Sequence, residues 1–153
     1  MVVPRVLDRA TPENTRLKVS LARQRAYLLV GEEVAIDAAV STGVARAQTP
    51  PGLFKIAEKA ATRNDSMHGD FVDAEGRVVR AGVSTRIDAA PSGTSFRMVP
   101  LRYFLGLDAE GVSLHAGRLP GFPSTDRSIR WPADIAPLVF QRVKEGTPVE
   151  IGD

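Results

Sequence analysis

The sequence predicts a mostly-β domain with one main helix near the C-terminus. Several short segments alternate apolar and polar side chains, which is the period of a half-buried strand. Glycine and proline, with 13 and 11 of the 153 residues, can supply the turns between such strands. Only Pro132–Glu145 has the apolar spacing of an amphipathic helix.

The N-terminal part is expected to form an arm followed by a hairpin. Residues 1–16 mix charge, Pro and Thr without a period, so we expect an N-terminal arm there and a single domain over 17–153. A first strand is expected where Leu17, Val19 and Leu21 alternate with polar residues. Strands over Gln24–Val30 and Val34–Val40 are expected to pair across a turn at Gly31-Glu32.

The middle of the chain alternates stiff turns with short strands. A Thr-Pro-Pro-Gly turn at 49–52 precedes an expected short strand at Leu53–Ala57. The polar stretch Lys59–Gly69 is expected to be a long, mobile loop. Two short strands are expected within Phe71–Val79, around the turn at 74–76, and further strands over 96–105 and 112–115.

The expected C-terminal helix has clear signals at both ends. Pro132 suits the first helical turn, because its missing N–H would have no partner there. Gly146 is a natural stop, and a final strand is expected over Thr147–Ile151. The apolar residues that would share one face of this helix are Ile135, Leu138, Val139 and Val143.

The composition excludes several classes of function. The chain has no cysteine, which excludes disulfides, thiolate metal sites and a cysteine nucleophile. The net charge of +2 comes from scattered residues, which favours a mixed solvated surface over nucleic-acid binding. No stretch is apolar enough for a membrane span, and Met1–Glu13 lacks the apolar core of a signal peptide. If the protein acts outside the cytoplasm, we expect its export signal to lie outside this chain.

Three stretches of sequence, taken in order, carry a resemblance to a known family. They are VSTG at 40–43 with TPPGLFKI at 49–56, then GDFVDAEGRVVRAGVS at 69–84 with RYF at 102–104, and finally HAGRLPGFPSTDRSIRWP at 115–132 with GTPVEI. Together they resemble the YkuD-type catalytic domain of L,D-transpeptidases, from about Leu17 to Ile151. The resemblance implies a β-sandwich-like fold with a helix close to the catalytic loop.

The resemblance also implies a reaction. Enzymes of this family cleave a peptidoglycan stem peptide between diaminopimelate and D-alanine through a cysteine acyl-enzyme. A histidine activates the thiol, and backbone N–H groups around the cysteine hold the oxyanion. No cofactor and no metal are implied.

The match breaks within the catalytic motif. The family motif is a histidine, a spacer, then Ser or Thr, His, Gly and Cys. His115 fits the general-base histidine and Thr125 fits the Ser/Thr position. Asp126 replaces the motif histidine, Arg127 replaces the glycine and Ser128 replaces the nucleophilic cysteine. Three consecutive changes favour natural degeneration or repurposing over a single engineered substitution.

A serine at the cysteine position leaves two interpretations. Ser128 with His115 as base would resemble other Ser–His acyl-transfer pairs. However, a hydroxyl is much less acidic than a thiol, and Arg127 disturbs the oxyanion loop if the backbone there needs a positive φ. Inactivity is therefore favoured. Asp126 is interpreted as a loop acid paired with Arg127 or with the arginine at 130, and the alternatives are a carboxylate orienting His115 or a metal ligand.

Four further residues bear on the site, and two of them, Arg130 and Tyr103, have two interpretations each. Arg130 fits the arginine that follows the cysteine in the family, either as a clamp for a stem-peptide carboxylate or as part of a structural ion pair. Tyr103 is a candidate groove residue, although core packing is favoured for it. Trp131 is expected to pack at the helix entry. His68, which imitates part of the motif as His-Gly-Asp, is interpreted as a solvent-exposed loop histidine.

These observations lead to three hypotheses about function. The first is an L,D-transpeptidase-like pseudoenzyme that retains the groove and binds peptidoglycan stem peptides or an envelope protein. The second is a serine-dependent transpeptidase or carboxypeptidase that uses Ser128 and His115. The third is an interaction or structural domain that no longer binds peptidoglycan. The first two imply a location in the cell envelope or periplasm.

Overall fold

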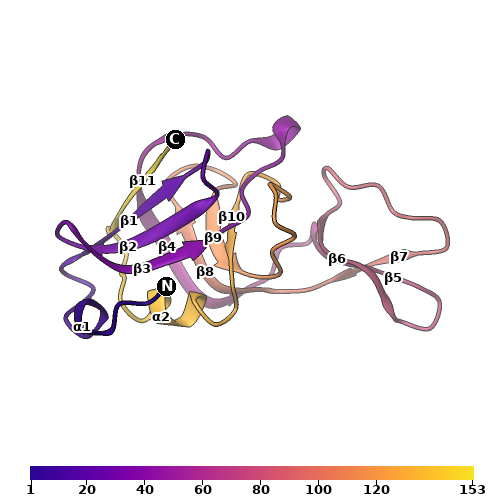
Figure 1. The fold of residues 1–153 in the computed structure, drawn as a ribbon. Helices are drawn as coiled ribbons and strands as arrows, with labels where there is room; N and C mark the ends of the chain where they lie inside the picture. Colours follow the sequence, from indigo (N-terminus) through magenta and orange to yellow (C-terminus); the bar gives the residue numbers. More distant parts are fainter.

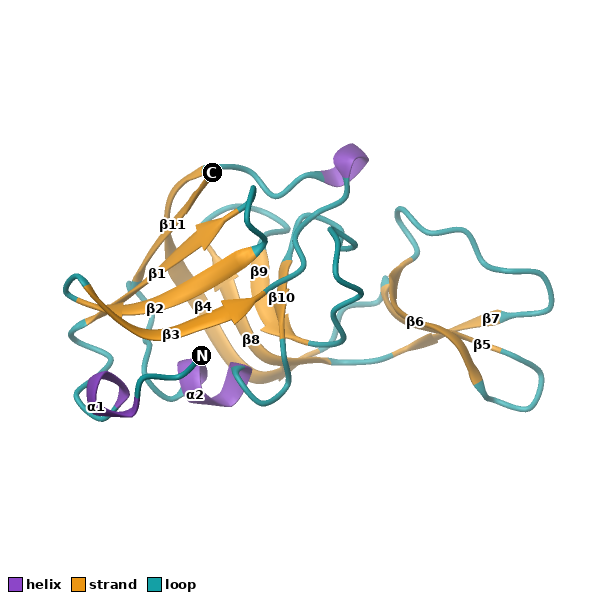
Figure 2. Ribbon diagram, viewed as in Figure 1, coloured by secondary structure: helices purple, strands orange, loops and turns teal.

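One eight-stranded mixed sheet forms the body of the protein. The computed structural model describes all residues from Met1 to Asp153. Figures 1 and 2 show the sheet curving around the core, with a smaller β structure extending from one side. In spatial order the strands are β10 (Ile129–Trp131), β9 (Ser113–Ala116), β8 (Leu101–Leu107), β4 (Gly52–Arg63), β11 (Pro148–Gly152), β1 (Thr15–Ser20), β2 (Arg25–Val30) and β3 (Glu33–Ala39). The mostly-β prediction is confirmed.

The predicted hairpin forms between β2 and β3. Val30 pairs with Glu33 across the turn at Gly31-Glu32, and Gly31 has a φ of 60°. Strand β1 pairs antiparallel with β2 on one side and parallel with β11 on the other. The C-terminal strand therefore lies between β1 and β4, which joins the two ends of the chain to the middle of the sheet.

The helix near the C-terminus is present but shorter than the sequence predicts. Helix α2 spans Ala136–Phe140, whereas the prediction was Pro132–Glu145. Pro137 lies at its start. Because proline has no backbone N–H, it cannot form the hydrogen bond to the preceding turn that would extend the helix toward the N-terminus. Beyond the helix, the carbonyl of Val143 accepts from Lys59 Nζ, and Gly146 N–H donates to Ile56 of β4. These bonds to β4 replace the helical ones.

The core lies on the side of the sheet that α2 covers. Trp131, Leu114, Ile129 and Val139 are each at most 1% exposed. Trp131 thus has the packing role that the sequence predicted. Residues before β1 also reach this core, because Val6 and Leu7 of the short helix α1 (Pro4–Leu7) are buried within it.

The prediction of a long mobile loop over Lys59–Gly69 is wrong. Strand β4 continues to Arg63 and pairs with β8 as far as Leu101. Only a short turn separates it from β5 (His68–Val72). The polar side chains gave no sequence signal for this strand. The strand forms because its backbone pairs with β8, which does not depend on those side chains. The predicted strand over 96–105 is likewise divided, into β7 (Ser95–Met98) and β8.

A second, three-stranded sheet projects from the body, and we call it the flap. It consists of β6 (Val78–Ser84), β5 and β7, with β5 in the centre. It contains the two strands that were predicted around the turn at 74–76, although β6 extends to Ser84. The flap extends away from the main sheet (Figure 1), and Gly82 of β6 accepts a hydrogen bond from Arg130 of β10.

A close backbone approach anchors the loop before β10. Gly43 forms an isolated bridge with Thr125, and a Cβ on Gly43 would lie 2.1 Å from the carbonyl oxygen of Ala47. A short 3-10 turn over Ala45–Ala47 brings that carbonyl inward, where it accepts the N–H of Arg127. Only glycine fits at position 43 without moving the chain.

We predict that Gly43→Ala destabilises the protein by about 1 to 3 kcal/mol, the usual cost of overpacking a rigid site. Gly152→Ala is the matched control, because a Cβ there would meet nothing within 4 Å. Urea denaturation measures both unfolding free energies. Equal stability of the two variants would contradict this account of Gly43.

Candidate active site

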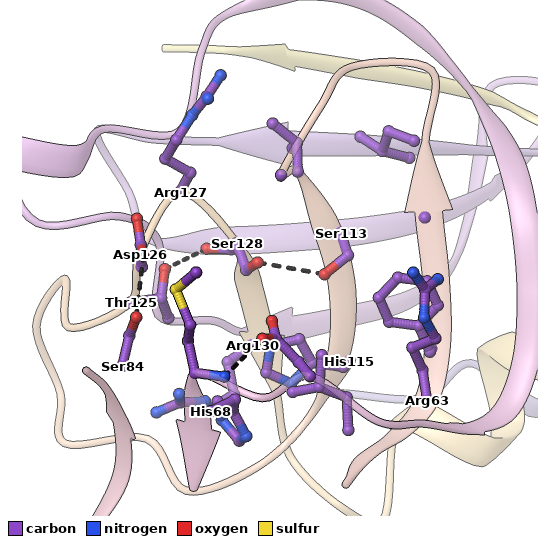
Figure 3. A pocket seen from close by; sticks show the side chains of 18 of the residues that line it. Arg63, His68, Ser84, Ser113, His115, Thr125, Asp126, Arg127, Ser128 and Arg130 are labelled. Carbon is purple, nitrogen blue, oxygen red and sulfur yellow. Dashed lines mark hydrogen bonds between the residues drawn. The ribbon is translucent and has the colours of Figure 1, made fainter. Parts of the chain in front are cut away.

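A cavity of about 930 Å³ lies where the flap base meets β8, β9 and the loop before β10. Figure 3 shows the side chains that line it. Six of the seven predicted site residues line it, namely His115, Thr125, Asp126, Arg127, Ser128 and Arg130. Tyr103 is not among the lining residues. It stacks edge-on against Phe140 of α2, with ring centroids 5.6 Å apart.

Strands β9 and β10 place His115 beside Arg130. The two strands are parallel, and these two residues are direct partners in the ladder. His115 is 2% exposed, and its Nδ1 is 3.1 Å from the carbonyl oxygen of Ala116. Because a carbonyl only accepts, Nδ1 carries the hydrogen in the neutral ring. Burial, helped by the positive charge of Arg130, lowers the pKa of His115 to about 3.

Ser128 lies directly before β10, and its hydroxyl has no base as a hydrogen-bond partner. Ser128 Oγ is 3.2 Å from Ser113 Oγ, and neither ring nitrogen of His115 forms a hydrogen bond with it. Figure 3 shows this serine pair within the cavity. A hydroxyl bonded to another hydroxyl is not deprotonated by it, so this arrangement lacks an activated nucleophile.

Arg127 occupies the position of the motif glycine with a glycine-like backbone. Its φ is 67°, in the left-handed region. Its N–H donates to Ala47, and its carbonyl accepts from Thr49 Oγ1 at 2.9 Å, so both sides of the peptide are held. The loop therefore keeps this conformation with an arginine in place, at a cost of about 1–2 kcal/mol. The Arg127 side chain points away from Ser128 and His115 (Figure 3).

Thr125 supports the same loop. Its N–H donates to Thr42, and its Oγ1 donates to the carbonyl of Ser128. Thr125 is 3% exposed, so it contributes to the cavity mainly as a brace for Ser128.

Asp126 joins the loop to the flap. Its carboxylate accepts two hydrogen bonds from Arg86, one of them at 2.7 Å, and a third from Ser84 Oγ at 3.0 Å. The predicted pairing with Arg127 or Arg130 is wrong, and Asp126 does not orient His115. We call this set of contacts the flap latch. Its hydrogen bonds from Arg86 hold the pKa of Asp126 below its usual range.

Arg130 is buried without an anionic partner. It is 5% exposed, and its guanidinium donates only to carbonyl oxygens, those of Gly82 at 3.1 Å and Arg118 at 3.4 Å. The predicted alternative of a structural ion pair is therefore wrong. Burial lowers the pKa of Arg130, with the negative charge of Asp88 opposing the shift. The remaining N–H groups are available to a ligand.

His68 is a second imidazole of the site, and the prediction of a solvent-exposed loop histidine is wrong. It begins β5, and its ring contacts that of His115 edge-on, with centroids 5.5 Å apart. Its Nδ1 is 3.1 Å from the carbonyl oxygen of Val99, while its buried Nε2 has no partner. Burial lowers the pKa of His68 below 6.5.

Sequence comparison identifies the family. The sequence profile of the L,D-transpeptidase catalytic domain, YkuD, matches residues 14–151. The chain belongs to this family. None of the curated proteins matches it.

Solved L,D-transpeptidases share the fold. An L,D-transpeptidase from Mycobacterium smegmatis has a TM-score of 0.68 and 15% identity, over 90% of this chain and 58% of that one. L,D-transpeptidase 1 of Mycobacterium tuberculosis gives 0.62 and 19%, over 91% and 62%. The Enterococcus faecium catalytic domain, solved acylated by ertapenem, gives 0.59 and 20%, over 90% and 96%. The chain thus spans about three fifths of the two mycobacterial proteins.

The chain contains no cysteine, which is the nucleophile of the L,D-transpeptidase motif. The positive φ at the glycine position and the buried histidine are present. Sequence reasoning did not identify Ser84, Arg86 and Ser113 as part of the site, and it misplaced His68. The only available signal was weak: a histidine directly before the GDFVDAEG stretch, which belongs to the resemblance itself.

We predict that Arg127→Gly is more stable than Arg127→Ala by about 1 kcal/mol, because glycine adopts a left-handed backbone without strain. Thermal and urea unfolding measure the difference. At the exposed Arg23, which has no positive φ, alanine should be at least as stable as glycine. A preference for alanine at 127 would argue against a strained loop.

The flap latch should give stability a specific pH dependence. The pKa of Asp126 is lower in the folded protein than the value of 3.8 for an ordinary aspartate, so its contribution is complete above that value and is lost as pH falls through the lowered pKa. We expect the native protein to be more stable than Asp126→Asn at pH 7, with a gap that closes in acid.

Glu32→Gln serves as the control for this measurement. Glu32 pairs with Arg16 at 3.4 Å, but its side chain is 96% exposed. Its loss should change the unfolding free energy by less than about 0.5 kcal/mol. A gap for Asp126→Asn that stays constant from pH 7 to pH 2 would disprove the ionic latch.

Proposed function

We propose that this protein is a non-acylating member of the L,D-transpeptidase family that binds peptidoglycan stem peptides. One observation carries the proposal: the hydroxyl at the cysteine position is bonded to Ser113 and not to His115. The family's thiol chemistry requires a cysteine, and the chain has none.

The chemistry of serine adds to this argument. A free thiol has a pKa of about 8.5, so a neighbouring imidazole or positive charge readily yields a thiolate. A hydroxyl needs a base within hydrogen-bond reach and a third group that orients the base. Asp126 was the candidate carboxylate to orient His115, but the flap latch holds it on Arg86 and Ser84.

Several features of the cavity favour retained binding. Its volume of about 930 Å³ suits a short peptide segment. Arg130 presents a buried positive charge that no protein carboxylate contacts directly, and burying a charge without a direct partner is costly. A stem-peptide carboxylate would supply that partner through charge-assisted hydrogen bonds.

The proposed ligand implies a place in the cell envelope. Peptidoglycan lies outside the cytoplasmic membrane, so a stem-peptide-binding domain would act there. No helix of the structure has the length and apolar character to cross a membrane.

A serine-dependent transpeptidase or carboxypeptidase is the second candidate. His115 is unprotonated at neutral pH, as a general base must be, but its pKa of about 3 makes it a weak base. For this chemistry, Ser128 would have to leave Ser113 and reach the imidazole.

Mass spectrometry with tetrapeptide stems tests the two candidates. We expect the native protein and Ser128→Ala to show the same intact mass and no release of D-alanine, while calorimetry detects saturable binding to both. We also expect no adduct with Ser128→Cys, because Asp126 and Arg127 still stand where the family motif has histidine and glycine.

The outcomes separate the candidates. An acyl adduct that disappears in Ser128→Ala would establish the serine enzyme. Acylation only in Ser128→Cys would show that the nucleophile was the sole missing group. Absence of binding to any variant would refute stem-peptide recognition.

A further inference from the structure

We propose that His68 is a specificity-determining residue of the cavity, and that its Nε2 accepts the backbone N–H of a peptide's C-terminal residue while Arg130 binds that residue's carboxylate. This inference rests on the proposed function, because it assigns the end of the stem peptide that the cavity recognises.

The first support is the tautomer of His68. Nδ1 lies 3.1 Å from the carbonyl oxygen of Val99, and a carbonyl can only accept, so Nδ1 carries the hydrogen. In the neutral ring, Nε2 is then a lone-pair acceptor. It is buried and has no hydrogen-bond partner. A buried acceptor without a donor is uncommon in folded proteins and is costly, so it requires an explanation.

The second support is the neighbour of this acceptor. Arg130 is a buried cation whose bonds go only to backbone carbonyls. Its guanidinium is held against Gly82, where the backbone has a φ of +64° and a Cβ would lie 2.8 Å from Nη1. Gly82 of β6 thus packs against the guanidinium of Arg130, and the adjacent flap strand β5 carries His68.

Together the two residues define a chemical class of ligand. An unpaired buried cation selects an anion, and an unpaired buried acceptor selects a donor. The C-terminal residue of a peptide carries a carboxylate and an amide N–H on the same Cα. A free inorganic anion would satisfy Arg130 and leave His68 unpaired, so the pair favours the peptide end.

Binding requires access to Nε2, which is buried in the ligand-free protein. The adjacent Met67 lines the cavity, is 46% exposed, and has a flexible side chain that can move aside. The proposal therefore requires a local movement that exposes Nε2 to the ligand.

The test compares two peptides that differ in one donor. The first is a tetrapeptide stem ending in D-alanine, and the second carries D-lactate there, which replaces the N–H by an ester oxygen. Calorimetry on the native protein should show about tenfold weaker binding of the ester, because the acceptor is left unpaired. Equal affinity for the two peptides would overturn the proposal without the need for any variant.

Two substitutions at one position assign the effect to Nε2. His68→Asn keeps a donor near Val99 and removes the acceptor, so it should bind both peptides with the same reduced affinity. His68→Gln places an amide oxygen near the position of Nε2 and should keep part of the discrimination. Full discrimination in His68→Asn would overturn the assignment to His68. Circular dichroism confirms that each variant is folded.

A pH series adds a readout that a purely structural role would not produce. Arg130, Asp65, Asp70 and His115 are the charged or titratable groups that act on His68. Protonation turns Nε2 into a donor, so native affinity should fall in acid as the lowered pKa of His68 is passed. The affinity of His68→Asn should lack this step.

If the native protein binds neither peptide, stem recognition fails and this inference fails with it, whereas equal binding of both removes only the inference.

Discussion

The parallel pairing of β9 with β10 is the constraint on which the site depends. It sets His115 and Arg130 side by side and places Ser128 at the point where the loop enters the sheet. Both strands are short and buried, and their apolar partners Leu114 and Ile129 belong to the main core. The polar side of this strand pair therefore cannot shift without disturbing the packing of the apolar side. This coupling fixes the positions of His115 and Arg130 relative to each other.

The loop before β10 shows what was kept and what was replaced. Its backbone is anchored by bonds to Thr42, Ala47 and Thr49, and these bonds hold Arg127 in a conformation that suits glycine. The histidine position of the motif now carries Asp126, whose hydrogen bonds run to the flap. The side chain of Asp126 thus connects the loop to the flap.

Two buried polar groups in the cavity lack the direct partners that such groups usually have. Arg130 has no counter-ion and His68 Nε2 has no donor, and both groups are buried. Folded proteins usually remove such costs by substitution, because an apolar side chain of similar size is often more stable at such a site. Their presence at the place where the serine, the histidine and the loop converge is the physical argument for a ligand. The same site lacks a base for Ser128.

The sequence by itself determined the mostly-β fold, the hairpin at Gly31-Glu32 and the break in the catalytic motif. These follow from local alternation, from turn chemistry and from the identity of single residues, all of which are visible along the chain. Only the tertiary structure decided the partners of Asp126, Arg130 and His68, because those contacts join residues from separate elements. It also decided the length of β4 and of α2, where hydrogen bonds to neighbouring strands prevailed over local polarity and helical spacing.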